Sequence, residues 1–165
     1  MTTNPFPPIR RIVTGHDDAG RAIIQSDEAF RSDPIAGGDA EFALVWTTGS
    51  VPADNNDETD GRSRDAGLTL NQGSVLRIVD FVPGGMSQMH RTNSIDYGIV
   101  LEGEIELEVD GGVKTVIGPH AIIVQRGTNH KWRNPSQTAY TRVAFVLIEA
   151  PAYIHEGRPL PEDKP

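Results

Sequence analysis

The clearest hydrophobic pattern in the chain is a strict alternation of apolar and acidic residues between Gly103 and Asp110. The apolar positions are Ile105, Leu107 and Val109, and the acidic positions between them are Glu104, Glu106 and Glu108. Because successive side chains of a strand point to opposite faces, this segment is predicted to be a strand with one packed and one solvated face. Asp110-Gly111-Gly112 then suits a tight turn, and residues 113–117 are predicted to return as the second strand of a hairpin.

Other short segments are rich in β-forming residues and are separated by glycine and proline turns. They are IRRIVTG and RAIIQSD around the turn at residues 16–20, EFALVWTT at residues 41–48, SVLRIVDF at residues 74–81, and residues 121–125 and 138–149. Asp27 to Arg31, before Pro34, allows one helical turn, and no segment supports a longer amphipathic helix. Many short strands with almost no helix predict an all-β fold, either a closed β-barrel or a two-sheet jelly roll.

A chain of 165 residues is expected to form one structural domain with its own core. Within it we expect N-terminal strands and an acidic loop over residues 1–73, the barrel over residues 74–150, and a C-terminal tail over residues 151–165. The segment from Val51 to Gly67 is acidic, rich in turn residues and without apolar periodicity. It is interpreted as a solvated surface loop, with a flap over a pocket as the alternative.

Composition narrows the classes of partner and of chemistry. The formal net charge of −8 argues against nucleic acid and anionic membranes as partners, because both would repel the chain. The absence of cysteine excludes disulfides, thiolate metal sites and cysteine nucleophiles. There is no basic-then-apolar leader and no apolar run long enough to span a membrane, so a soluble, cytoplasmic protein is expected.

Two histidines and an aspartate are the candidates for chemistry. Gln88, His90 and Thr92 stand at i, i+2 and i+4, so a strand would direct all three to one face. A turn follows, and Asp96 on the next antiparallel strand would return close to the level of His90. His130 comes after another turn and opens a further strand. These segments are therefore predicted to bring His90, Asp96 and His130 into one small pocket.

The segment from Gly84 to Gly103 resembles the first motif of the cupin superfamily. That motif is glycine, five residues, histidine, one residue, histidine, three or four residues, glutamate, six residues and glycine. Gly84, His90, Thr92, Asp96 and Gly103 keep every spacing. Thr92 replaces the second histidine and Asp96 replaces the glutamate, so this chain departs from the motif at two of its ligand positions.

The second segment resembles the second cupin motif, in which glycine, histidine and asparagine recur. Gly127, His130 and Asn134 keep its spacing, Gln125 stands where proline is usual, and Gly118 lies one place early. In cupins the matching positions bind a divalent metal. The resemblance therefore implies His90, Asp96 and His130 as ligands for Fe, Mn, Ni or Zn. The alternative is a metal-free acid–base set made of the same three residues.

The remaining expectations concern the pocket wall, the function and the assembly. Gln88 and Thr92 are expected to line the pocket, with Phe81, Tyr97 and Trp132 as aromatic walls. The resemblance implies an enzyme acting on a small organic molecule, such as an aromatic or polyketide-like one, as a lyase, dehydratase, decarboxylase, isomerase or dioxygenase. The alternative is a non-catalytic cupin that binds a small ligand as a sensor or carrier. A homodimer formed through the N-terminal hairpin, residues 9–27, is also expected.

Overall fold

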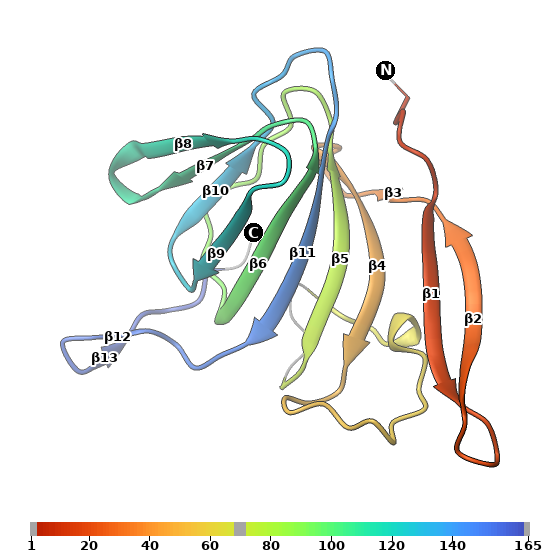
Figure 1. Ribbon diagram of the computed structural model, residues 1–165. Coiled ribbons are helices and arrows are strands. Elements are labelled where there is room, and N and C mark those ends of the chain that lie inside the picture. Colours follow the sequence, from red (N-terminus) through yellow and green to blue (C-terminus); the bar gives the residue numbers. More distant parts are fainter. Residues whose placement is uncertain (1–2, 68–71, 164–165) are drawn as a thin grey trace.

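The computed structural model describes residues 3–67 and 72–163, and its main element is a six-stranded antiparallel sheet (Figure 1). The strand order is β3-β4-β5-β11-β6-β9. In that order the strands are Asp33–Pro34, Ala40–Thr48, Ser74–Phe81, Thr141–Glu149, Ser94–Glu102 and Ile122–Arg126. The sheet curves around the molecule's interior, so one face of each strand points inward.

A second, three-stranded sheet has the order β10-β7-β8. Its strands are His130–Arg133, Ile105–Val109 and Val113–Ile117. The predicted hairpin is confirmed: β7 pairs with β8 across a short 3₁₀ turn at Asp110–Gly112 (η2), where Gly111 adopts a φ of 75°. Such a left-handed conformation costs glycine little, which explains the Gly-Gly pair.

The core lies between the two sheets and is built by alternation along the strands. On β5, Val75, Val79 and Phe81 point inward, and on β11 so do Val143, Phe145 and Leu147. Ile105 of β7 and Trp132 of β10 close the core from the smaller sheet. Each fully buried side chain of this size contributes about 1.5–3 kcal/mol of hydrophobic stabilisation, so this layer accounts for much of the stability. The all-β barrel predicted from the sequence is therefore confirmed.

The N-terminal hairpin lies outside the barrel. It consists of β1 (Ile9–His16) and β2 (Ala22–Phe30), and it projects beside β4 (Figure 1). Ile9 and Phe30 pack against a small cluster on the outer face of the large sheet. The helical turn expected at residues 27–31 is wrong, because pairing with β1 draws the backbone of this segment into β2.

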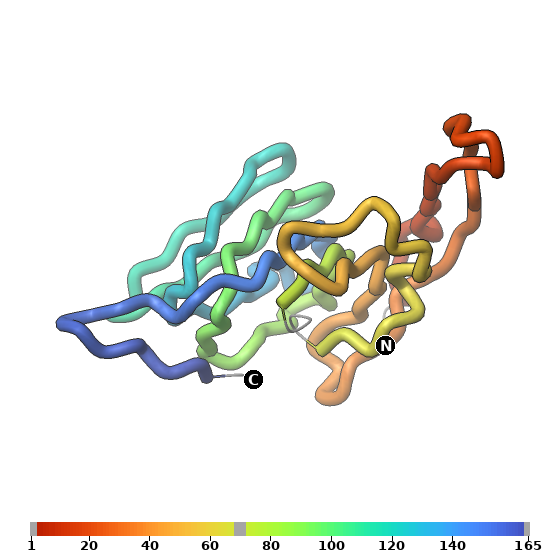
Figure 2. Tube along the Cα trace, turned by 90° about the horizontal axis from the view of Figure 1, so that it is seen from below, coloured from red at the N-terminus to blue at the C-terminus, as the bar shows by residue number. Residues whose placement is uncertain are grey.

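The other excursions from the barrel are short. A 3₁₀ turn, η1 (Gly61–Ser63), interrupts the acidic loop, and a small hairpin of β12 (Ile154–His155) and β13 (Arg158–Pro159) extends from the opposite end. Figure 2, seen from below, places this C-terminal hairpin and the N-terminal hairpin at opposite ends of the molecule. Within the described ranges, no helix is long or apolar enough to cross a membrane.

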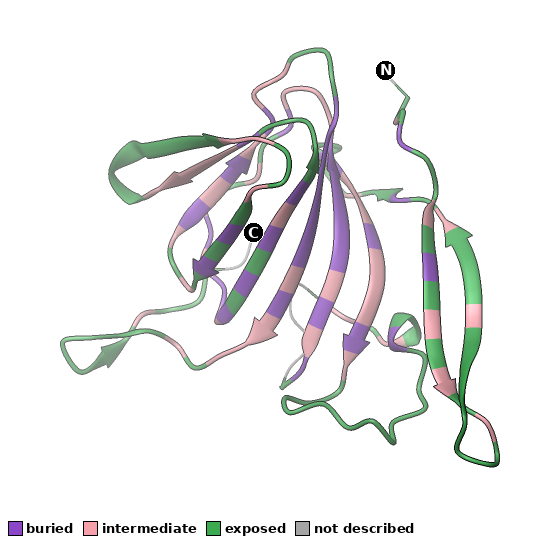
Figure 3. Cartoon of the chain, in the orientation of Figure 1, coloured by how far each residue is buried: buried purple, intermediate pink, exposed green. Residues whose placement is uncertain are grey.

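The predicted boundary between N-terminal strands and barrel at residue 74 needs correction. β4 pairs with β5 from Ala40 to Thr48 and is therefore an integral strand of the large sheet. The acidic loop, residues 51–67, is mainly exposed (Figure 3), although Ala66 packs against the core. Its interpretation as a surface loop fits this exposure, and the alternative role as a flap remains a prediction.

Candidate active site

A cavity of about 410 Å³ opens inside the barrel, and we call it the barrel cavity. It is lined by Ile35, Ala36, Asp39, Ala40, Phe42, Arg77, Val79, Phe81, Met86, Ser87, Gln88, His90, Thr92, Asp96, His130, Trp132, Phe145 and Leu147. The structure thus brings together seven of the eight residues predicted for the site, although they come from segments far apart in the sequence. Its volume falls in the range of small-molecule sites, about 300–1,000 Å³.

His90 and His130 are direct neighbours in this cavity. Their backbones form an isolated antiparallel bridge, in which each N–H donates to the other residue's carbonyl at 2.8 and 2.9 Å. The two imidazole rings have centroids 4.3 Å apart and are inclined by 49°. The predicted convergence of the two histidines is therefore what the structure shows, and it depends on the pairing of the residue 86–92 segment with β10.

Each imidazole is oriented through its Nδ1 atom. His90 Nδ1 lies 2.9 Å from the carbonyl oxygen of Gln88, which can only accept, so Nδ1 carries the proton and Nε2 keeps the lone pair. His130 Nδ1 lies 2.9 Å from the Thr128 carbonyl and 2.9 Å from the Gln125 side-chain amide. In both rings the protein engages Nδ1 and leaves Nε2 as the nitrogen available to a ligand.

His130 is held in its neutral form. Its side chain is almost fully buried, and burial lowers the pKa of the imidazole to about 4, with the nearby His90 adding to this effect. The hydrogen bond to the Thr128 carbonyl opposes the shift. An imidazole with so low a pKa stays uncharged near neutral pH, where it can donate or accept a hydrogen bond without carrying charge.

Asp96 faces the same cavity from β6. It is only 5% exposed, and burial raises the pKa of its carboxyl to about 6, while the Ser94 hydroxyl and the positive charge of Arg77 oppose this rise. Its Oδ1 atom is buried without a hydrogen-bond partner. A carboxyl group with this pKa changes protonation close to neutral pH, as a general acid or base must.

Tyr97 does not line the cavity, so its predicted place in the pocket wall is wrong. Alternation along β6 turns Ser94, Asp96, Gly98 and Val100 inward and leaves Tyr97 on the outer face, where it is 40% exposed. Placing Asp96 inside therefore required its neighbour to point outward. By contrast, Phe81 and Trp132 form apolar wall as predicted, and the Trp132 ring meets His130 edge-on with centroids 5.4 Å apart.

Comparison with known proteins supports the family resemblance. The family model described as "Cupin domain" matches residues 77–147. "Phomopsin biosynthesis cluster protein C'" of Diaporthe leptostromiformis is 42% identical over 156 residues, covering 90% of this chain and 82% of that protein. This chain belongs to the cupin superfamily.

Two further similarities agree with the cupin assignment. "Cupin-domain-containing oxidoreductase srdB" of Neurospora crassa is 32% identical over 169 residues, covering 99% of this chain and 86% of that protein. Among solved structures, the Schizosaccharomyces pombe Cnp3 cupin domain superposes with a TM-score of 0.53 at 10% identity. That alignment covers 85% of this chain and 87% of the other, and at this identity it supports the fold alone.

Cupins commonly bind a metal in such a cavity, and His90, Asp96 and His130 are the side chains that would have to bind it here. Sites for Zn or Fe need at least three protein donors around one point. Within residues 3–67 and 72–163, no group of three His, Asp or Glu side chains is arranged to hold a metal ion. The rings of His90 and His130 are in contact with each other. The pKa of the Asp96 carboxyl is instead influenced by Ser94 and Arg77. The residues present therefore do not fit the predicted three-ligand centre, and we derive no step through a metal.

Thr92 and Asn134 of the cupin motifs have structural surroundings. Thr92, in place of the second motif histidine, is 2% exposed, and its hydroxyl lies 2.9 Å from that of Ser94. The Asn134 amide donates to the backbone carbonyls of Phe81, Val82 and Ala139 at 2.8–3.2 Å. Asn134 thus ties the end of β5 to the start of β11, and it acts on the cavity by fixing its wall.

Arg77 and Asp39 are the charged residues of the cavity that sequence reasoning missed, and of the two only Arg77 is buried. It lies on β5 between Val75 and Val79, all three inward-facing, and it is 8% exposed. In SVLRIVDF an arginine occupies an inward position of an otherwise apolar alternation, and this was the available signal. Burying a guanidinium is costly unless it meets compensating groups, so an inward arginine in a predicted strand deserves a functional explanation.

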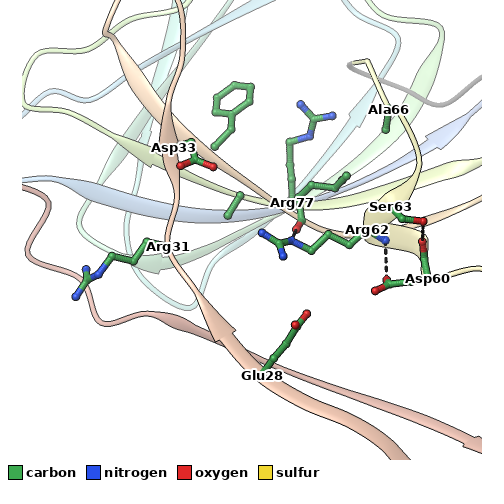
Figure 4. Close-up of a pocket in the computed structure, with 11 residues that line it drawn as sticks. Glu28, Arg31, Asp33, Asp60, Arg62, Ser63, Ala66 and Arg77 are labelled. Carbon is green, nitrogen blue, oxygen red and sulfur yellow. Dashed lines mark hydrogen bonds between the residues drawn. The ribbon is translucent and has the colours of Figure 1, made fainter.

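A second cavity, of about 500 Å³, lies at the edge of β4 near the N-terminal hairpin, and we call it the outer cavity (Figure 4). Its charged lining residues balance, with Glu28, Asp33 and Asp60 against Arg31, Arg62 and Arg77. Asp60 accepts from the Arg62 backbone amide and binds Arg11. Phe42 and Arg77 line both cavities, so they form the partition between the outer cavity and the barrel cavity.

Proposed function

We propose that this cupin is an enzyme that acts on a small organic molecule by acid–base chemistry at His90, His130 and Asp96. The single observation that carries the proposal is the contact between two imidazoles in a largely apolar cavity that also contains a buried carboxyl with a pKa of about 6. Groups whose environments push their pKa values in opposite directions are typical of acid–base sites.

The proposed step is proton transfer at a carbon next to a carbonyl group. His90, with its Nδ1 proton committed to Gln88, uses Nε2 to remove the proton, and the electron pair moves to the carbonyl oxygen. Protonated Asp96 donates its proton to that oxygen, so the substrate becomes a neutral enol. His90 then holds one proton and Asp96 has lost one. When the carbonyl compound also contains a conjugating C=C bond, the enol is a dienol: His90 returns its proton to the far carbon and the enol hydroxyl returns the other to Asp96, which completes an isomerisation with no change in atoms or electrons and no co-reactant.

The role of His130 follows from its neutral state. A neutral imidazole beside His90 can donate a hydrogen bond to the developing oxyanion, or accept one from the substrate, without adding a charge that would oppose protonation of His90. Relatives named as biosynthesis cluster proteins and as oxidoreductases support a small-molecule enzyme but leave the reaction open. Isomerisation and dehydration can begin from the proposed proton transfer, and decarboxylation of a β-keto acid yields the same kind of enol.

The test uses enolisable compounds with an aromatic or apolar body. Phenylpyruvate and ethyl benzoylacetate are incubated with the protein, and the rate of deuterium incorporation from D₂O is followed by NMR. We expect acceleration that falls by about 10²-fold or more in His90→Ala, the range typical of a lost general base. His155→Ala, at an exposed histidine of β12, is the matched control and should keep the parent rate.

Two results would count against this function. Exchange at the parent rate in His90→Ala would remove His90 as the base. Tight binding of such compounds with no exchange in the parent protein would favour a non-catalytic ligand-binding cupin instead. Elemental analysis of metal-supplemented protein supplies the remaining comparison: stoichiometric metal lost in both His130→Ala and Asp96→Ala would support metal-assisted chemistry.

A further inference from the structure

Arg77 is the only permanently charged cation among the described residues that line the barrel cavity. Its strand partners are Leu44 on β4 and Phe145 on β11. One row further along the sheet, Leu147 of β11 lies opposite Asp96 of β6. Since β11 separates β5 from β6 by a single strand, Arg77 and Asp96 project into the same part of the cavity on a diagonal, and each influences the other's ionisation.

A glycine of β6 makes room for an aromatic ring beside these two residues. In the row of Arg77 and Phe145, the β6 position is Gly98. A Cβ atom at Gly98 would lie 3.0 Å from the Phe145 ring and 3.4 Å from Ile123, closer than such contacts normally permit. The missing side chain therefore leaves room for the Phe145 ring, which lines the barrel cavity together with Arg77 and Asp96.

Two contacts help to hold the guanidinium in place. Its Nη2 atom donates to the Gly67 carbonyl at 2.5 Å, and its carbon lies 5.4 Å from the centre of the Phe42 ring. These contacts fix the head group at the partition with the outer cavity, and a guanidinium has five N–H donors in a planar fork. An anchored, planar cation at the end of an apolar cavity is well suited to a carboxylate, which it can meet through parallel hydrogen bonds.

Asp96 supplies the second recognition element. Its Oδ1 atom lies buried in the cavity wall without a hydrogen-bond partner, and the whole side chain is 5% exposed. A buried oxygen without a donor costs free energy that a ligand hydroxyl would recover. Trp132 and Phe145, whose rings lie 5.3 Å apart, add aromatic wall to the same cavity.

We propose that Arg77 anchors a carboxylate of the substrate while Asp96 Oδ1 accepts a hydrogen bond from a neighbouring hydroxyl, so that the substrate class is a small aromatic or enolic hydroxy acid. This rests on the proposed function, because the anchor would seat such a molecule against His90 and His130. It also assigns Arg77 as the residue that determines specificity: a neutral ester or amide of the same size would leave the guanidinium without the anion. Recognition built on buried polar groups discriminates strongly against analogues that lack the matching group.

The test measures binding and therefore does not depend on turnover. Salicylate and its neutral isostere salicylamide are titrated by calorimetry, with Trp132 fluorescence as a second signal. We expect salicylate to bind at least tenfold more tightly than salicylamide. Arg77→Gln should weaken salicylate at least tenfold and leave salicylamide within about twofold, while Arg77→Lys should fall between. Arg126→Gln, which removes an exposed arginine of β9, is the matched control and should change neither dissociation constant.

The hydroxyl contact has its own comparison. Benzoate lacks the hydroxyl and should bind the parent more weakly than salicylate, and Asp96→Ala should remove this difference. Equal affinity for salicylate and salicylamide in the parent, or no binding of salicylate at millimolar concentration, would overturn the assignment. If Arg77→Gln does not fold, the acid–amide pair on the parent and on Arg77→Lys still decides it.

Different results would disprove the Arg77 anchor and the proposed acid–base function. In His90→Ala, salicylate binding should persist while deuterium exchange is lost. If exchange persists there but salicylate binds through Arg77, the acid–base assignment is wrong and the anchor stands. If exchange depends on His90 but Arg77→Gln leaves salicylate binding unchanged, the anchor is wrong and the acid–base assignment stands.

Discussion

Asp96 and His130 line one cavity, yet burial moves their pKa values in opposite directions, to about 6 for the carboxyl and about 4 for the imidazole. Both shifts have the same main cause, which is that burial disfavours the charged form of each group. Near neutral pH this leaves an uncharged imidazole beside a carboxyl that is close to its titration point. The relationship has measurable consequences for stability as well as for catalysis.

The two groups should oppose each other in the pH dependence of stability. Between pH 4 and 6 native Asp96 retains a proton that the unfolded chain releases, so this residue makes the free energy of unfolding fall as pH rises. Native His130 lacks a proton that the unfolded chain binds up to its ordinary pKa of 6.5, so it makes the free energy of unfolding rise. Each effect amounts to about 3 kcal/mol and they nearly cancel.

Substituting either Asp96 or His130 should reveal the pH dependence of stability that the other residue causes. Relative to the parent, Asp96→Asn should make the free energy of unfolding rise more steeply between pH 4 and 6, and His130→Gln should make it fall. Urea unfolding at half-unit pH steps measures both slopes. Asp18→Asn and His155→Gln, at exposed positions, are controls that should follow the parent curve. A parent-like slope in both cavity variants would contradict the opposing shifts.

Gln125 should control the protonation of His130. Its amide nitrogen lies 2.9 Å from His130 Nδ1 and carries no charge, so Gln125 places no negative charge beside the ring that would favour the imidazolium. Gln125→Glu places a carboxylate there and should raise the pKa of His130 from about 4 toward its ordinary value, measured by NMR titration of the imidazole. Gln137→Glu adds the same charge at an exposed site and should leave that titration unchanged.

The buried ion pair of Asp80 and Arg142 should be important for stability. Asp80 is fully buried and accepts hydrogen bonds from Arg142 Nε at 2.6 Å, from Arg142 Nη2 and Ser32 at 2.7 Å, and from Asn4 at 2.9 Å. Asp80→Ala leaves the guanidinium buried without its carboxylate and should lower the free energy of unfolding by about 3–5 kcal/mol. Denaturant unfolding measures this loss.

A matched variant separates this effect from the loss of any salt bridge. Asp27 binds Arg10 on the exposed hairpin at 2.5 Å. Asp27→Ala should lower the free energy of unfolding far less than Asp80→Ala does, because solvent screens exposed pairs. Similar losses in Asp80→Ala and Asp27→Ala would mean that the buried pair has no special role.

We expect a homodimer, formed where apolar side chains remain exposed. The outer face of β6 and β9 exposes Ile95, Tyr97, Leu101, Ile122 and Val124, and the N-terminal hairpin exposes Ile12, Ile23 and Ile24. A projecting two-stranded hairpin is marginally stable by itself, so a second copy whose hairpin covers this face would stabilise both surfaces. Val124→Lys should convert the dimer to a monomer in light scattering. Val113→Lys, equally exposed but on β8, should not. A parent protein that is monomeric at all concentrations would contradict this expectation.

The sequence predicted most of the site because strand alternation and turn residues act locally. The Ile105–Val109 strand and its Gly111 turn follow from neighbouring residues, and the motif spacing around His90 and His130 implied their convergence. Tyr97 was misplaced although alternation from Asp96 already directed it outward. Arg77 was missed although the alternation in SVLRIVDF already directed it inward, whereas the inclusion of β4 in the barrel depends on pairing between distant strands, about which local patterns contain little information.

The glycine at position 98 has a consequence for how ligand preference can evolve. The Phe145 ring occupies the space that a side chain at position 98 would need. Adding a single methyl group at position 98 should therefore push that ring toward the imidazoles and narrow the barrel cavity. Larger ligands would then be excluded from the cavity, while His90, His130 and Asp96 kept their positions. Related proteins could therefore change the size of ligand that they accept through a single substitution at this position, without altering the reaction.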